Sequence, residues 1–115
     1  MSVDLKTRLC AAVDAAFDRQ VDFLSELTSH PSTRGNERSA QDFMARELGA
    51  RGYEIDRWQI DLAEISHLPG FSPCQGPYED AVIVVGTNRS RTGQGRSLIL
   101  NGHIDVVPAG PLDMW

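Results

Sequence analysis

Glycine and proline are distributed unevenly along this chain of 115 residues, and their placement constrains its fold more than any other feature. Residues 1–30 contain neither type, whereas residues 69–115 hold seven of the ten glycines and five of the six prolines. Because these residues break helices and mark turns, we expect helix at the start of the chain and strands and loops at its end. No internal repeat or linker is visible, so the pattern predicts one small α/β unit.

Two helices are predicted in the first half of the chain. Apolar side chains recur every three or four residues from Val3 to Leu27, which predicts one long amphipathic helix with its apolar stripe packed in the core. The stripe consists of Leu5, Leu9, Val13, Phe17, Val21, Leu24 and Leu27. Asn36 is a typical capping residue, so a second helix is expected to begin near it, and Gly52 suits a left-handed stop.

About three strands of a mixed sheet are predicted to follow the two helices. Residues 53–60 alternate imperfectly between apolar and polar side chains, which indicates a strand. Residues 81–85 and 98–100 are continuous apolar runs, typical of strands buried on both faces. Residues 61–79 are expected to form a long irregular segment, and the polar, glycine-rich residues 86–96 a hairpin connection. The predicted fold class is therefore α/β or α+β, with a layered core.

Charge and cysteine content exclude several classes of protein. Eleven Lys and Arg residues against sixteen Asp and Glu residues give a net charge of −5, which argues against a nucleic-acid binder. No stretch approaches the roughly 18 apolar residues of a transmembrane helix, and the first residues lack a secretory signal pattern. Cys10 and Cys74 cannot build a disulfide framework. We therefore expect a cytoplasmic protein with no nucleic-acid or membrane partner.

His103 and Asp105 are the candidate functional residues, because they follow the apolar run 98–100 directly. In extended chain, residues two apart project to one face with Cα atoms about 6–7 Å apart. A histidine and a carboxylate so placed suit a metal ligand and the acid that orients it; a purely structural hydrogen-bonded pair is the alternative. Two such residues cannot complete a zinc site. His30 and His67 are interpreted as solvated.

The surrounding motif resembles a known family. Residues 97–110, SLILNGHIDVVPAG, resemble the first metal-ligand motif of the acetylornithine deacetylase/succinyl-diaminopimelate desuccinylase family, whose relatives include aminoacylases and glutamate carboxypeptidases. Residues 24–37, LSELTSHPSTRGNE, resemble that family's segment leading into its second helix. The resemblance implies that His103 binds one of two zinc or cobalt ions and that Asp105 is catalytic. It also implies hydrolysis of an amide bond in an N-acyl amino acid or small peptide substrate.

The resemblance also bears on how the chain is organised. Members of the family are several times longer, which implies that residues 1–115 are the N-terminal part of a zinc-peptidase-like catalytic domain. The later metal ligands, the general-base glutamate and the inserted domain that commonly forms a homodimer all lie outside this sequence. We therefore expect the 115-residue chain alone to be inactive. The alternatives are a dipeptidase or carboxypeptidase of the same family, or a non-catalytic truncated α/β fragment.

Overall fold

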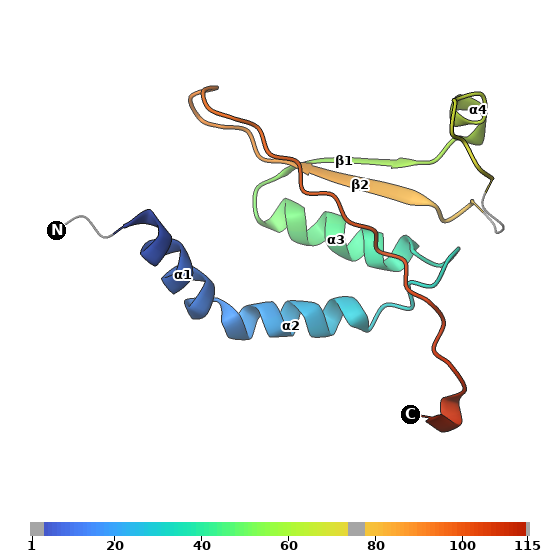
Figure 1. Cartoon of the computed structure of the whole chain (residues 1–115), viewed down its shortest axis with the longest axis horizontal. Coiled ribbons are helices and arrows are strands. Elements are labelled where there is room, and N and C mark those ends of the chain that lie inside the picture. Colours follow the sequence, from blue (N-terminus) through green and yellow to red (C-terminus); the bar gives the residue numbers. More distant parts are fainter. Residues whose placement is uncertain (1–3, 74–77, 115) are drawn as a thin grey trace. The chain divides into compact units, whose positions relative to one another are not determined.

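The computed structural model describes residues 4–73 and 78–114, and it contains both helices and strands, which is compatible with the α/β class. The chain divides into two compact units, Met1–His30 and Pro31–Trp115. In chain order the elements are α1 (Leu5–Ala15), α2 (Phe17–Thr28), α3 (Arg38–Ala50), β1 (Glu54–Gln59), α4 (Leu62–Ile65), β2 (Val82–Thr87) and the 3-10 turn η1 (Leu112–Met114) (Figure 1). None of the helices in these ranges has the length and apolar character needed to cross a membrane. Val3, Cys74 and Trp115 lie outside the described residues.

The first unit contains two helices where the sequence predicts one, and the break falls at Ala16. This residue has φ −99° and ψ 1°, outside helical geometry. The Val13 carbonyl accepts hydrogen bonds from the Ala16 amide at 3.0 Å and from Gln20 Nε2 at 3.1 Å. The Ala16 bond spans three residues where a regular helix has four, and the Gln20 side chain occupies the same carbonyl. Both interrupt the i to i−4 hydrogen bonds of the helix, which is a recognised cause of helix breaks. The prediction of one continuous helix is wrong.

The apolar stripe of α1 and α2 is not buried. Its members from Leu5 to Leu24 are between 48% and 63% exposed, and neither helix contains a buried residue. The predicted core packing of this stripe is therefore wrong for the described residues. Periodicity defines which face of a helix is apolar, but it does not supply the surface that would cover that face.

The second unit is built on one helix and a two-stranded antiparallel sheet. Strands β1 and β2 pair so that Trp58 lies opposite Ile83, and α3 packs against both strands (Figure 1). The small core lies at this contact: Ala40 and Phe43 of α3 and Val82 of β2 are at most 3% exposed. The strand predictions for residues 53–60 and 81–85 are confirmed as to element type and approximate position.

The turns around α3 differ in part from the prediction. The helix begins at Arg38, and its cap residue Glu37 makes no capping hydrogen bond through its side chain. Asn36 Nδ2 instead donates to Thr33 Oγ1 at 3.0 Å, so the side chain bonds within the preceding turn and not to the first turn of the helix. The left-handed stop is confirmed, because Gly52 has φ +82°.

The third predicted strand does not form. Residues 98–100 belong to no strand, and Leu98, Ile99 and Leu100 are 81–87% exposed. A strand requires a neighbour that pairs with its backbone, and none of the described residues pairs with this run. The connection 86–96 therefore closes no hairpin.

The expected burial of β2 on both faces is also wrong. Val82 is buried, but Val85 is 43% exposed. Among the described elements of the second unit, only α3 packs on the sheet. The apolar run therefore predicts the strand correctly, but it does not predict whether one or both faces of that strand are covered by other elements.

Candidate functional site

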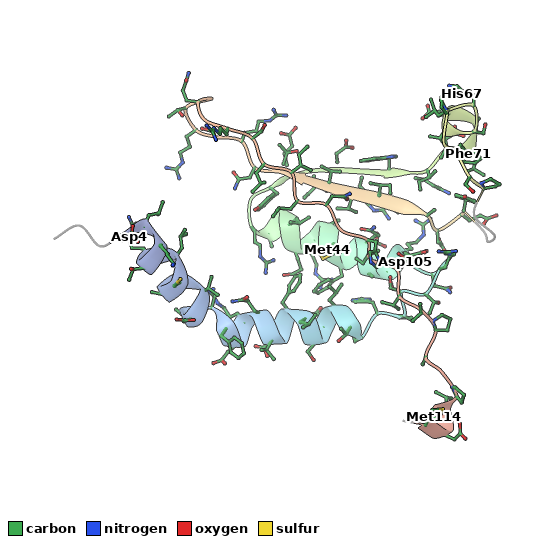
Figure 2. All side chains as sticks on the ribbon, viewed as in Figure 1. Asp4, Met44, His67, Phe71, Asp105 and Met114 are labelled. Atoms are coloured by element: carbon green, nitrogen blue, oxygen red, sulfur yellow. The ribbon has the colours of Figure 1, made fainter. Side chains whose placement is uncertain are left out.

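The His103 and Asp105 side chains lie together on one side of the segment that follows residue 100. His103 Nδ1 is 3.1 Å from Asp105 Oδ1 and 3.0 Å from the Asp105 carbonyl oxygen. This is the common face that their spacing predicts. The His103 side chain is 85% exposed, whereas that of Asp105 is 37% exposed. Figure 2 places Asp105 beside the turn that leads into α3.

The two oxygens at Nδ1 determine what the imidazole can do. A neutral imidazole carries one N–H, and two acceptors at Nδ1 favour the tautomer that is protonated there. The lone pair then lies on Nε2, on a ring that is largely exposed to solvent. A carboxylate behind a metal-binding histidine has this arrangement, since it fixes the tautomer and the orientation of the ring. The pair therefore fits one ligand to a divalent ion.

The pair does not complete a metal site. Within residues 4–73 and 78–114, no group of three His, Cys, Asp or Glu side chains is placed to hold a metal ion. Zinc normally takes three or four protein ligands. The described residues thus offer a ligand and its supporting acid, and further ligands would have to come from elsewhere.

Ser32 and Thr33, which lie about 70 positions earlier in the sequence, hold the segment that carries the pair. Ser32 Oγ donates to the Ile104 carbonyl at 2.8 Å, and the Val106 amide donates to the Ser32 carbonyl at 2.8 Å. Thr33 and Val106 form a parallel bridge. These contacts flank Asp105 on both sides. Sequence reasoning missed them, although a small hydroxyl residue directly after Pro31 was the available signal.

Within the described residues of the second unit, no other histidine lies beside the His103–Asp105 pair. His67 follows α4 and is exposed, and Figure 2 shows it beside α4 and away from Asp105. His30 belongs to the first unit. The interpretation of His67 as a solvated residue agrees with its exposure.

Two ion pairs of the second unit connect α3 and β1 to the segments on either side of β2. Arg38 pairs with Asp80 and donates to the Glu79 carbonyl at 2.8 Å, and its hydrogen bond to Asp80 raises the pKa of Arg38. Arg89 Nε lies 2.9 Å from Glu54 Oε2, and this contact raises the pKa of Arg89. Such exposed pairs fasten elements to one another and contribute little stability each.

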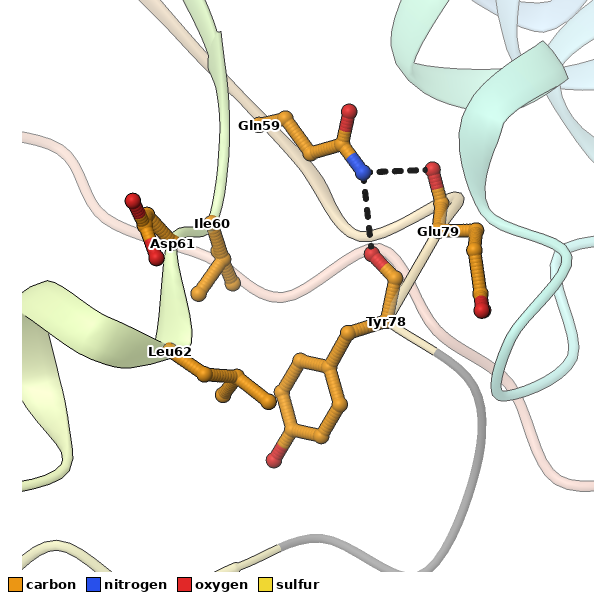
Figure 3. Close-up of a pocket in the computed structure, with 6 residues that line it drawn as sticks. All are labelled: Gln59, Ile60, Asp61, Leu62, Tyr78 and Glu79. Atoms are coloured by element: carbon orange, nitrogen blue, oxygen red, sulfur yellow. Dashed lines mark hydrogen bonds between the residues drawn. The ribbon is translucent and has the colours of Figure 1, made fainter.

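A shallow hollow of about 480 Å³ lies at the end of β1 (Figure 3). It is lined by Gln59, Ile60, Asp61, Leu62, Tyr78 and Glu79. Gln59 Nε2 donates to the carbonyls of Tyr78 and Glu79, and the Asp61 carboxylate accepts from the Ala63 amide. The Gln59 and Asp61 side chains therefore bond to neighbouring parts of the chain, and the hollow includes neither His103 nor Asp105.

Comparison with known proteins agrees with the family resemblance of the motif. No family model matches the chain. The chain is similar to succinyl-diaminopimelate desuccinylases. It is 31% identical over 90 residues to the protein from Ectopseudomonas mendocina, 33% over 92 residues to that from Leptothrix cholodnii and 28% over 96 residues to that from Acidovorax ebreus. The matches cover 78–80% of this chain.

The chain spans only about a fifth of these relatives. The matched share is 18%, 20% and 21% of their respective lengths. The similarity therefore supports a relationship to amide hydrolases of the desuccinylase type.

Proposed function

We propose that this chain is part of the catalytic domain of a metal-dependent amide hydrolase of the desuccinylase type. The observation that carries the proposal is the His103–Asp105 pair, in which a carboxylate oxygen lies 3.1 Å from Nδ1 and the imidazole is largely exposed. This arrangement favours the tautomer that leaves Nε2 available to a metal ion. The three relatives support it, since each is named as a desuccinylase. Under this proposal residues 1–115 are the N-terminal part of the domain.

Each residue of the pair has one role in this proposal. His103 offers Nε2 as a ligand to one of two divalent ions, zinc or cobalt. Asp105 accepts the Nδ1 hydrogen bond and keeps the ring in that orientation, 3.1 Å from its carboxylate oxygen. A bound divalent ion supplies a Lewis acid that polarises an amide carbonyl and lowers the pKa of water. The remaining ligands, the general base and any dimer-forming domain belong to residues outside this sequence.

The substrate class follows from the relatives' names. We infer an N-acyl amino acid as substrate and a succinyl group as the acyl group removed, in preference to the acetyl group of acetylornithine. The isolated chain is expected to be inactive, because one histidine and one carboxylate leave too few ligands for a metal centre.

A chimera tests the proposal. The chain replaces the segment that it matches in the Ectopseudomonas mendocina desuccinylase, and hydrolysis of N-succinyl-diaminopimelate and acetylornithine is assayed with added zinc or cobalt. The chimera is expected to hydrolyse the succinyl substrate. His103→Ala is expected to lower kcat/KM by more than about 100-fold, and Asp105→Asn by about 10–100-fold, the loss typical of a group that supports a ligand.

His67→Ala is the matched control, because it removes an exposed imidazole that is separate from the pair. It should leave kcat/KM unchanged. A cooperatively folded chimera that is inactive, or one whose activity survives His103→Ala, would overturn the proposal. Faster hydrolysis of acetylornithine than of the succinyl substrate would overturn the choice of acyl group alone.

A further inference from the structure

The Ser32 side chain is the one buried polar side chain among the described residues, with 4% exposure. Burying a hydroxyl costs free energy unless a hydrogen bond compensates for it. Here the compensating acceptor is the carbonyl of Ile104, the residue between His103 and Asp105, at 2.8 Å. A hydroxyl that could have bonded within its own turn instead reaches a residue 72 positions away.

A second contact fixes the other side of Asp105. The Val106 amide donates to the backbone carbonyl of Ser32 at 2.8 Å, in the parallel bridge between Thr33 and Val106. One residue, Ser32, thus bonds to the peptide groups on both sides of Asp105. Residues 98–100 form no strand, so among residues 4–73 and 78–114 no strand pairs with the segment that leads into His103.

We propose that Ser32 is the positioning residue for the His103–Asp105 pair. Its hydroxyl fixes the backbone between them, so that the Asp105 carboxylate stays within hydrogen-bond distance of His103 Nδ1 and the ring presents Nε2 to solvent. This inference rests on the proposed function for its chemical purpose. The dependence of the geometry of the pair on Ser32 can be tested in the absence of any metal.

The experiment uses the metal-free 115-residue chain, labelled with ¹⁵N, and compares wild type with Ser32→Ala. Two signals are measured: hydrogen exchange of the Val106 amide, and the imidazole nitrogen shifts of His103 at pH 8, where an ordinary imidazole is neutral. Wild type is expected to show protection at Val106 and the Nδ1–H tautomer at His103. Ser32→Ala should lower protection about three- to tenfold, the effect of one lost hydrogen bond, and shift the tautomer toward Nε2–H.

Two controls separate positioning from a general loss of structure. Amides of the paired strands, such as Arg57 and Val84, should keep their protection in Ser32→Ala. Ser90→Ala removes an exposed hydroxyl that bonds only within its own turn, so it should leave both signals unchanged. If Ser32→Ala also loses the sheet, Ser32→Thr and Ser32→Cys decide. Retention of both signals by Thr with loss by Cys supports the proposal, and equal behaviour of the two overturns it.

Unchanged Val106 protection and an unchanged His103 tautomer in Ser32→Ala would overturn the inference. A final titration with ZnCl₂ keeps the two proposals apart. If Zn²⁺ does not change the ¹⁵N chemical shift of His103 Nε2 in the wild type, the proposed ligand role of His103 is wrong. The Val106 and His103 signals measured without metal still test the role of Ser32. If Zn²⁺ binds, Ser32→Ala should weaken that binding several-fold, because the ring is less well oriented.

Discussion

Gly86 of β2 lies close to the side chains of Leu48 in α3 and Tyr53. A Cβ atom at this position would lie 3.1 Å from Leu48 Cδ1 and 3.2 Å from Tyr53 Cδ1, both tighter than ordinary contact. The backbone there does not need a positive φ, so the restriction is the lack of space. Interiors that are already packed resist added methyl groups, because neighbouring side chains must leave their preferred rotamers.

Gly86→Ala is therefore expected to lower the free energy of unfolding of the second unit by about 1–3 kcal/mol. Urea denaturation followed by circular dichroism measures the change. Gly110→Ala is the matched control, since nothing lies within 4 Å of a Cβ at that position. Equal stability of the two variants would show that Leu48 moves aside freely and that the contact is loose.

The sequence predicts the conformation of some individual residues and misses the contacts of others. The spacing of His103 and Asp105 predicts their common face, and the residue type at Gly52 predicts its positive φ, because both follow from local geometry. The role of Ser32 depends on a partner 72 positions away. The predicted cap at Asn36 did not form, because the helix begins two residues later and the Asn36 side chain is directed to Thr33 through its Nδ2 donor.

An ion pair that responds to pH joins Glu47 of helix α3 to Arg51, the residue that caps the C-terminal end of the helix. Arg51 Nη1 lies 2.8 Å from Glu47 Oε2, at the helical spacing i, i+4. The hydrogen bond from Arg51 is the main cause of a lowered pKa at Glu47, which Arg46 reinforces. Because the folded pKa is below the unfolded value, the pair stabilises the helix above the ordinary glutamate pKa. That contribution is lost as the pH falls through the folded pKa.

Glu47→Gln should therefore lower the Tm slightly at pH 7, and the difference from wild type should vanish in acid, once Glu47 is protonated. Thermal melts between pH 7 and pH 2 measure it. The gap at pH 7 should also shrink in about 1 M salt, which screens exposed charges. A Tm difference that is constant across the pH range would assign the effect to helix propensity and contradict the ion-pair account.

Among the elements, those with local signals were predicted well and those that depend on partners were not. The strands predicted at residues 53–60 and 81–85 form, as β1 and β2, because each carries β-forming side chains and each pairs with the other. The run 98–100 has an equally strong composition but finds no neighbour among the described residues. The split between α1 and α2 depends on the Val13 carbonyl and the side chain of Gln20, which periodicity does not register.

The whole chain exposes an apolar run that a stable monomer would bury. Leu98, Ile99 and Leu100 are three consecutive exposed residues, and no strand in the part of the chain that the structure describes pairs with them. Adjacent exposed apolar residues of this kind form a template for pairing with another chain. We therefore expect the 115-residue chain to self-associate through this segment.

Ile99→Lys should reduce that association, because a charge on an unpaired apolar segment opposes edge-to-edge pairing. Size-exclusion chromatography with light scattering, over a range of protein concentrations, measures it. Val107→Lys is the control, since Val107 is equally exposed but lies outside the run. A wild-type chain that stays at its monomer mass of 12.7 kDa at every concentration would contradict the prediction.

The binding of Zn²⁺ to this chain tests the ligand role of His103 most directly. Isothermal titration calorimetry of the wild type is expected to show weak binding, because a single imidazole supported by one carboxylate makes an incomplete site. His103→Ala should abolish the specific part of that binding, whereas His67→Ala should leave it unchanged. Tight, stoichiometric Zn²⁺ binding that survives His103→Ala would contradict the assignment of His103 as the metal ligand.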